Sequence, residues 1–122
     1  MRIRLVLVDD HPVVREGLRA MLSTEPDLDV VADCALAEDA LRAVAEFEPD
    51  VVLMDLRLPG MDGVEATARI TAHSAARVLV LTTFDSDTDI LRAVESGATG
   101  YLLKDAPRTD LVHAIRAAAR GE

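Results

Sequence analysis

Several short apolar runs in this sequence end at a charged residue. An apolar run of about four residues that ends in this way is typical of a buried parallel strand, whose last residue emerges at the edge of the sheet. The edge at the carboxyl ends of the strands is also where open α/β sheets hold their functional groups. Three such runs with the charged residues that follow them are residues 5–8 with Asp9 and Asp10, residues 51–54 with Asp55, and residues 101–103 with Lys104.

Apolar runs alternate with amphipathic segments along the whole chain. Between the runs, apolar residues recur every three or four positions, which places one apolar stripe on each helix. Strict alternation of five strands with five helices predicts right-handed crossovers and a parallel sheet covered on both faces. We therefore expect one doubly wound α/β domain of three layers, a (βα)5 fold. Its strands are expected at residues 3–8, 28–32, 51–54, 78–82 and 100–103.

Proline and glycine mark several borders of these elements. Pro12 suits the first turn of a helix, and residues 58–60, Leu-Pro-Gly, are typical of a turn. Gly97 fits the C-terminus of a helix, and Gly100 fits a tight entry into the last strand. Residues 61–63 are compatible with either a loop or the start of a helix.

The composition bounds the class of protein. A chain of 122 residues, half of them hydrophobic, has the size of one domain with a proper core. Its apolar runs are far shorter than the roughly 20 residues of a transmembrane helix, and its N-terminus lacks a signal-peptide pattern. The only cysteine, Cys34, excludes an internal disulfide and is expected to be a small buried residue. We expect a cytoplasmic protein without a membrane segment.

The charge of the chain argues against nucleic acid as a direct partner. It carries 22 acidic and 13 basic residues, for a net charge of -9, and its aromatic residues are one tyrosine and two phenylalanines. Such a surface repels phosphate backbones and offers neither a basic stripe nor a stacking platform. We expect a protein or a cation as the partner of this segment.

The charged strand ends together predict a phosphoryl site. Carboxyl ends of neighbouring strands lie about 5 Å apart, so Asp9, Asp10 and Asp55 share one crevice if their strands are neighbours. Two like charges 4 Å apart repel by roughly 4 kcal/mol at an effective dielectric near 20, and oxygen ligands favour Mg²⁺ as the neutralising cation. Lys104 adds a positive charge, and Thr82 adds a hydroxyl at the end of the fourth strand.

Each of these residues has a simpler explanation when it is taken alone. An aspartate after a strand is commonly a helix cap or a loop residue, and a lysine is commonly a solvated surface charge. His11 follows the acid pair, but Mg²⁺ prefers oxygen ligands, so a helix-start or loop role is favoured for it. The functional interpretation depends on four strand ends that each carry a group needed by one reaction.

The order and spacing of longer motifs carry a family resemblance. They are residues 8–18 (VDDHPVVREGL), 55–63 (DLRLPGMDG), 78–84 (VLVLTTF) and 97–105 (GATGYLLKD). With these motifs the chain resembles the receiver domain of two-component response regulators, especially the NarL/FixJ (LuxR-type) subfamily. The resemblance implies the CheY/flavodoxin-like strand order 2-1-3-4-5, a receiver at residues 1–118, and the start of a linker at residues 119–122 to a C-terminal effector, normally a helix-turn-helix DNA-binding domain.

The resemblance implies a role for each acidic residue. Asp55 would accept a phosphoryl group from a phosphohistidine of a sensor histidine kinase. Asp10 and Asp9, the latter through water, would hold Mg²⁺ together with Asp55 and the backbone carbonyl of Arg57. Mn²⁺ is a possible substitute for Mg²⁺. The domain would catalyse its own phosphorylation and dephosphorylation without being an enzyme of the ordinary turnover kind.

The resemblance also implies which residues bind and report the phosphoryl group. Lys104 and the Thr82 hydroxyl would bind phosphoryl oxygens, with the backbone N–H groups of Arg57 and Thr83. Thr82 and Tyr101 would form the switch that favours homodimers. Arg57 and Phe84, two residues beyond Asp55 and Thr82, would tune hydrolysis of the phosphoryl group. Many receivers carry proline directly after the lysine, with a cis peptide; Asp105 stands there in this chain, which leaves that peptide's geometry open.

Two other functions compete with the receiver. A small Mg²⁺-dependent phosphohydrolase of the haloacid-dehalogenase type would also use Asp55 as nucleophile. Such enzymes usually carry a second aspartate two residues on, where this chain has Arg57, and no cap segment is apparent. An unphosphorylated pseudo-receiver would act only as an interaction module, and the intact set of acids, Thr82 and Lys104 argues against it.

Overall fold

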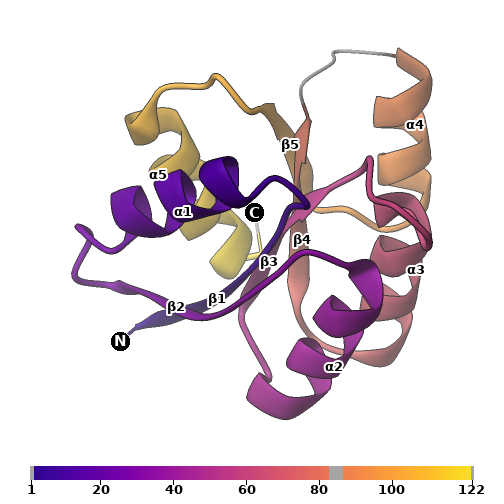
Figure 1. Ribbon diagram of the computed structural model, residues 1–122, viewed down its shortest axis with the longest axis horizontal. Helices are drawn as coiled ribbons and strands as arrows, with labels where there is room; N and C mark the ends of the chain where they lie inside the picture. Colours follow the sequence, from indigo (N-terminus) through magenta and orange to yellow (C-terminus); the bar gives the residue numbers. More distant parts are fainter. Residues whose placement is uncertain (1, 83–86, 122) are drawn as a thin grey trace.

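The computed structural model describes residues 2–82 and 87–121. In that part of the chain, five strands alternate with five helices, as predicted (Figure 1). The strands are β1 (Ile3–Val8), β2 (Leu28–Cys34), β3 (Val51–Asp55), β4 (Arg77–Thr82) and β5 (Gly100–Leu103). The helices are α1 (Pro12–Leu22), α2 (Ala37–Phe47), α3 (Gly63–His73), α4 (Asp87–Glu95) and α5 (Arg108–Ala119).

The strands form one parallel sheet in the order β2-β1-β3-β4-β5, which confirms the expected topology. Helices α1 and α5 cover one face, and α2, α3 and α4 cover the other (Figure 1). No helix in the described ranges is long and apolar enough to cross a bilayer.

The alternation of side chains along the central strands builds two cores. In β1, Leu5 and Leu7 pack on the side of α1 and α5, whereas Val6 and Val8 pack on the side of α2 and α3. Both faces are buried along residues 5–8 because the helices cover both, so this part of the strand is apolar at every position. Each fully buried aliphatic side chain stabilises the fold by about 1.5–3 kcal/mol. This continuous burial explains why short unbroken apolar runs marked the strands.

The register of the sheet brings the strand ends to one edge. Val8 of β1 pairs with Met54 of β3, and Asp55 pairs with Leu81 of β4. Thr82 pairs with Leu103 of β5. The residues that follow these pairs therefore emerge side by side, which is the geometric condition for a shared crevice.

Three strands differ from the sequence-based expectation: β3 ends one residue later, at Asp55, β4 begins one residue earlier, at Arg77, and β2 ends two residues later. β2 continues to Cys34, two residues beyond the expected end at residue 32, because a register shift opposite residues 5 and 6 of β1 lets it pair on to Val8. Helix α3 begins at Gly63, and the Asp62 side chain caps it by accepting a hydrogen bond from the backbone N–H of Glu65 at 2.9 Å. Residues 61–63 are therefore a loop followed by a helix start.

The expected positions of Gly97 at a helix end and of Cys34 in the interior are confirmed. Gly97 ends α4 in a left-handed conformation, with φ of 104°, and a Cβ there would lie 2.7 Å from the Thr71 hydroxyl. Cys34 is buried at the end of β2, and this burial raises the pKa of its thiol to about 11. A thiol with that pKa is almost entirely protonated near neutral pH and is a poor nucleophile.

Candidate functional site

The structure brings the three predicted aspartates together at the carboxyl edge of the sheet. One side-chain ligand atom from each of Asp9, Asp10, Asp55 and His11 lies within 4.8 Å of the others. Asp9 and Asp55 are buried, with 2% and 5% of their surface exposed. They reach this position because each ends or follows a central strand, and carboxylates so placed repel one another unless a cation neutralises them.

Lys104 provides one such cation. Its Nζ atom lies 2.7 Å from Asp9 Oδ2 and 3.0 Å from Asp55 Oδ2. Burial acts to lower the pKa of Lys104, but its hydrogen bonds to Asp9 and Asp55 outweigh burial, so the pKa is raised. The ammonium is therefore held charged between two buried carboxylates. A charge in this position can later bind oxygen atoms of another anion.

Asp55 has an environment suited to a nucleophile. Burial raises the pKa of its carboxyl, and this effect outweighs hydrogen bonds from the Arg57 backbone N–H, at 3.1 Å, and from Lys104. The charge of Asp9 raises the pKa further. A raised pKa makes the carboxylate a stronger base than an exposed one. Hydrogen bonds to both of its oxygens fix its orientation.

Asp10 shows that the residues present fit a divalent cation. Its Oδ1 atom is buried and has no hydrogen-bond partner in the described part of the chain. A buried carboxylate oxygen without a partner is costly. Mg²⁺ takes oxygen ligands of this kind and usually binds one or two carboxylates together with waters and phosphate oxygens. The acidic pocket, which we define as Asp9, Asp10 and Asp55, has the donor set for that ion.

The remaining predicted residues belong to β4, to β5 or to the segment outside the described ranges. Thr82 is buried at the end of β4, one residue beyond the partner of Asp55, and its carbonyl accepts a hydrogen bond from the Lys104 backbone N–H at 2.9 Å. Tyr101 lies on the edge strand β5 and is 44% exposed. Thr83 and Phe84 fall outside the described residues. The peptide between Lys104 and Asp105 is trans.

Gly63 sets the approach of α3 to the end of β3. Its backbone N–H donates to the Leu56 carbonyl at 3.0 Å. A Cβ at this position would lie 2.2 Å from the Asp55 carbonyl oxygen and 2.6 Å from Leu56 Cα. Only glycine leaves room for this contact. The sequence pattern at residues 61–63 is compatible with a loop or a helix start and gives no sign that Gly63 borders the site.

Two further residues near the acidic pocket were not predicted from the sequence. His11 precedes α1, as expected, but its Nδ1 atom lies 3.1 Å from Asp10 Oδ1 and 3.3 Å from Asp9 Oδ1. Arg15 donates from Nη1 to the Asp9 carbonyl at 2.6 Å and from Nε to Asp33 Oδ1 at 3.1 Å. The available signal for His11 was its place directly after Asp9 and Asp10 in the sequence.

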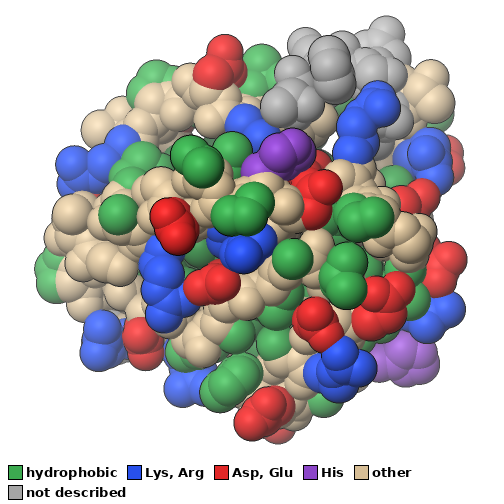
Figure 2. Space-filling view, viewed as in Figure 1, with side chains coloured by type: hydrophobic (Ala, Val, Ile, Leu, Met, Phe, Trp, Pro, Cys, Tyr) green, Lys and Arg blue, Asp and Glu red, His purple; other side chains and the backbone are tan. Residues whose placement is uncertain are grey.

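The surroundings of the site agree with the charge of the sequence. Figure 2 shows basic side chains scattered singly among acidic ones on the face in view, without a basic stripe.

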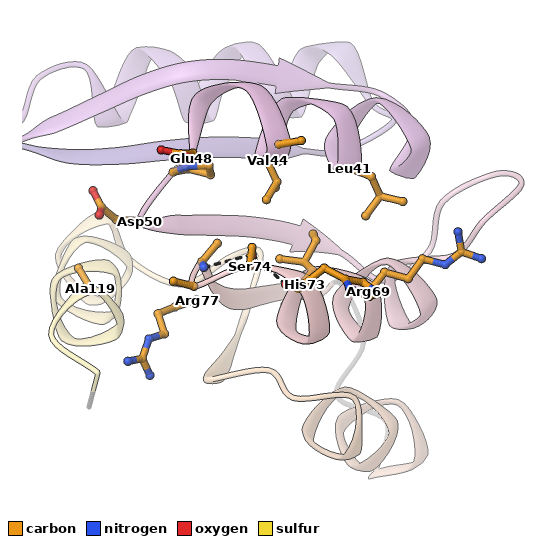
Figure 3. Close-up of a pocket in the computed structure, with 14 residues that line it drawn as sticks. Leu41, Val44, Glu48, Asp50, Arg69, His73, Ser74, Arg77 and Ala119 are labelled. Atoms are coloured by element: carbon orange, nitrogen blue, oxygen red, sulfur yellow. Dashed lines mark hydrogen bonds between the residues drawn. The ribbon is translucent and has the colours of Figure 1, made fainter.

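A separate groove of about 1010 Å³ lies between α2 and α3 (Figure 3). It is lined by Asp50, Arg77 and Ala119, near the starts of β3 and β4 and the end of α5, so it opens at the opposite end of the sheet.

Curated relatives match nearly the whole chain. Residues 5–116 match the response regulator receiver domain family. The transcriptional regulatory protein LiaR of Bacillus subtilis is 43% identical over 121 residues, which are 98% of this chain and 57% of LiaR. The response regulator VraR of Staphylococcus aureus is 41% identical, over 100% of this chain and 59% of VraR. The chain thus spans less than two thirds of the length of these relatives.

Solved structures show the same fold at close similarity. The signal receiver domain of the response regulator NarL of Mycobacterium tuberculosis superposes with a TM-score of 0.95 at 37% identity, covering 99% of this chain and 98% of that one. A LuxR-family two-component response regulator of Aurantimonas gives 0.93 at 44% identity, covering 100% and 88%. Together with the acidic pocket and its lysine, these matches show that the chain belongs to the response regulator receiver domain family, among its NarL/LuxR-type members.

Proposed function

We propose that Asp55 accepts a phosphoryl group from a phosphohistidine of a sensor histidine kinase. The observation that carries this proposal is the Lys104 ammonium, which bridges two buried carboxylates, Asp9 and Asp55, beside the unpartnered Asp10 oxygen. Phosphoryl transfer needs a positioned nucleophile and positive charge around the phosphoryl oxygens. The acidic pocket with Lys104 supplies the nucleophile and one positive charge.

Mg²⁺ is the cofactor that this pocket would hold. Asp10, Asp55, the Arg57 carbonyl and, through water, Asp9 are its proposed ligands, and Mn²⁺ is a proposed substitute. When bound, the cation neutralises carboxylates and takes a phosphoryl oxygen, which lowers the repulsion between Asp55 and the incoming anion.

The chain's own residues then carry the transfer. A carboxylate oxygen of Asp55 forms the new bond to phosphorus, and the phosphorus–nitrogen bond to the kinase histidine breaks with its electron pair moving to the imidazole. Lys104 exchanges its contact with Asp55 for a phosphoryl oxygen. The Thr82 hydroxyl and the backbone N–H groups of Arg57 and Thr83 bind the remaining oxygens. No general base is required, because the ionised carboxylate carries no proton to remove.

The output of the switch is proposed to reach a separate effector. Thr82 would move toward the new phosphate, Tyr101 would turn inward from its exposed position, and the altered surface would favour a homodimer. We propose a C-terminal effector beyond a linker that starts at residue 119; LiaR and VraR support additional chain, because this sequence covers 57% and 59% of them. We infer that DNA is bound by that effector rather than by residues 1–118, and that the protein acts in the cytoplasm without turning over a substrate.

Intact mass measurement tests the phosphoacceptor. The protein is incubated with acetyl phosphate and Mg²⁺, and a gain of one phosphoryl group is expected that disappears in Asp55→Ala. Asp29→Asn is the control, because Asp29 is the second residue of β2 and lies at the opposite end of the sheet. Turnover of varied phosphoesters without a stable mass gain would instead indicate the phosphohydrolase. A complete lack of modification would indicate an unphosphorylated interaction module.

A further inference from the structure

The donor atoms around the acidic pocket are not all oxygens. His11 Nδ1 lies 3.1 Å from Asp10 Oδ1 and 3.3 Å from Asp9 Oδ1. It belongs to the same group of atoms within 4.8 Å that includes Asp55. The ring is two-thirds exposed, whereas the Asp9 side chain is almost completely buried. His11 therefore stands at the solvent side of the pocket.

These separations match those between neighbouring ligands of one metal ion. With metal–ligand distances near 2.1 Å, neighbouring ligands lie about 3.0 Å apart in an octahedral site and about 3.4 Å apart in a tetrahedral one. The approach of His11 Nδ1 to Asp10 Oδ1 falls between these values, yet Asp10 Oδ1 has no hydrogen-bond partner. His11 Nδ1 is also within hydrogen-bond distance of Asp9 Oδ1, at 3.3 Å, so a cation shared by the three side chains would satisfy Asp10 Oδ1 and replace that contact.

The backbone holds His11 in this place. Its N–H donates to Asp9 Oδ1 at 2.9 Å, and its carbonyl accepts from the Arg15 N–H at 3.0 Å in the first turn of α1. The His11 side chain makes no capping hydrogen bond to the helix. Removing the imidazole therefore leaves the start of α1 intact, which allows a clean substitution.

The chemistry of the donor set selects the ion. Imidazole nitrogen suits first-row transition metals such as Zn²⁺, whereas Mg²⁺ takes oxygen ligands almost exclusively. We propose that His11 Nδ1 is a metal ligand, and that with the acidic pocket it forms a site for a first-row transition-metal dication that binds more tightly than Mg²⁺. This proposal rests on one part of the proposed function, namely that the acidic pocket binds a cation. It does not depend on phosphorylation of Asp55.

Calorimetry with Zn²⁺ and with Mg²⁺ on the untagged 122-residue chain tests this site. We expect Zn²⁺ to bind at least tenfold more tightly than Mg²⁺, and His11→Ala to reduce the ratio of the two affinities at least tenfold. His73→Ala is the matched control, because His73 is exposed at the end of α3. Thermal unfolding of each variant in EDTA verifies that it is folded.

Nitrogen NMR of the histidine rings provides a readout that does not depend on phosphorylation. On addition of Zn²⁺, the Nδ1 resonance of His11 is expected to shift, whereas the ring resonances of His73 and His113 are not. An unshifted His11 resonance, or an unchanged affinity ratio in His11→Ala, would overturn the proposal. Equal losses of Zn²⁺ and Mg²⁺ affinity would also overturn it, because they indicate a structural role. Zn²⁺ binding through His11 in a chain that acetyl phosphate does not modify would refute the phosphoacceptor and leave this site standing.

Discussion

Single residues outside the acidic pocket determine its geometry, and Arg15 is the first of them. It joins the Asp9 carbonyl to Asp33, whereas the neighbouring Arg19 binds Asp33 only. We expect the free energy of unfolding of Arg15→Ala to be about 1–2 kcal/mol lower than that of Arg19→Ala. The reason is that Arg15→Ala leaves the part-buried Asp9 carbonyl without its charged donor. We also expect Arg15→Ala to be modified more slowly by acetyl phosphate. Urea denaturation and intact mass provide the two measurements, and equal values for both variants would contradict the role of Arg15.

Gly63 is the second such residue. A methyl group there would collide with the backbone of Asp55 and Leu56, so Gly63→Ala is expected to lower the free energy of unfolding by about 1–3 kcal/mol and to slow modification of Asp55. Gly17→Ala is the opposite case, because a Cβ at Gly17 in the middle of α1 meets nothing within 4 Å. It is expected to stabilise the protein by about 0.5–1 kcal/mol. Chemical denaturation of both variants measures the two changes in the free energy of unfolding. Changes of the same sign would refute the steric argument.

At the scale of elements, ion pairs join the segment before β2 to α5. Arg116 binds Glu25 at 2.9 Å and Asp27 at 2.8 Å, and Arg108 also binds Glu25. Hydrogen bonds from Arg108 and Arg116 lower the pKa of Glu25, and those from Arg116 lower the pKa of Asp27. This cluster is the described ionic link between α5 and the loop that follows α1.

The lowered pKa values predict how stability depends on pH. A carboxyl whose pKa is lower in the folded state contributes stability that is complete above its unfolded pKa, here 4.5 for Glu25 and 3.8 for Asp27, and is lost as pH falls through the folded value. We expect Arg116→Met to flatten the decline of melting temperature below pH 4.5. Arg69→Met, which removes an exposed pair with Glu65 on α3, is expected to leave that decline unchanged. Parallel declines in the wild type and Arg116→Met would contradict the assignment.

The elements differ in how far the sequence predicts them. β1 and β5 have the expected bounds, because each of their apolar runs ends directly before a charged residue, Asp9 or Lys104. β2 is longer than expected because its last residues are held by pairing with β1, which no apolar pattern records. The meeting of the acidic residues and Lys104 followed from parallel strands together with the strand order that the family resemblance implies. The positions of His11 and Arg15 against the pocket depend on the angle at which α1 leaves β1, and hydrophobic periodicity contains no information about that angle.

At the scale of the whole molecule, the fold gathers more negative charge at one edge than its lysine neutralises. Three aspartates meet there with Lys104 as the cation that contacts two of them. The cost of this repulsion is present whenever the domain is folded and is absent when it is unfolded. A cation that binds only the folded state must therefore stabilise the entire domain.

Melting temperature is consequently a direct measure of cation binding. A free Mg²⁺ concentration one hundred times the dissociation constant adds about 2.7 kcal/mol to the free energy of unfolding, so the wild type is expected to melt higher in Mg²⁺ than in EDTA. Asp10→Asn removes one of the repelling charges and a ligand, so it should melt higher than the wild type in EDTA and gain little from Mg²⁺. Asp29→Asn should respond to Mg²⁺ as the wild type does. An Asp10→Asn protein with the full Mg²⁺ response would show that the cation binds elsewhere, and the Asp10 oxygen that lacks a hydrogen-bond partner would then need another explanation.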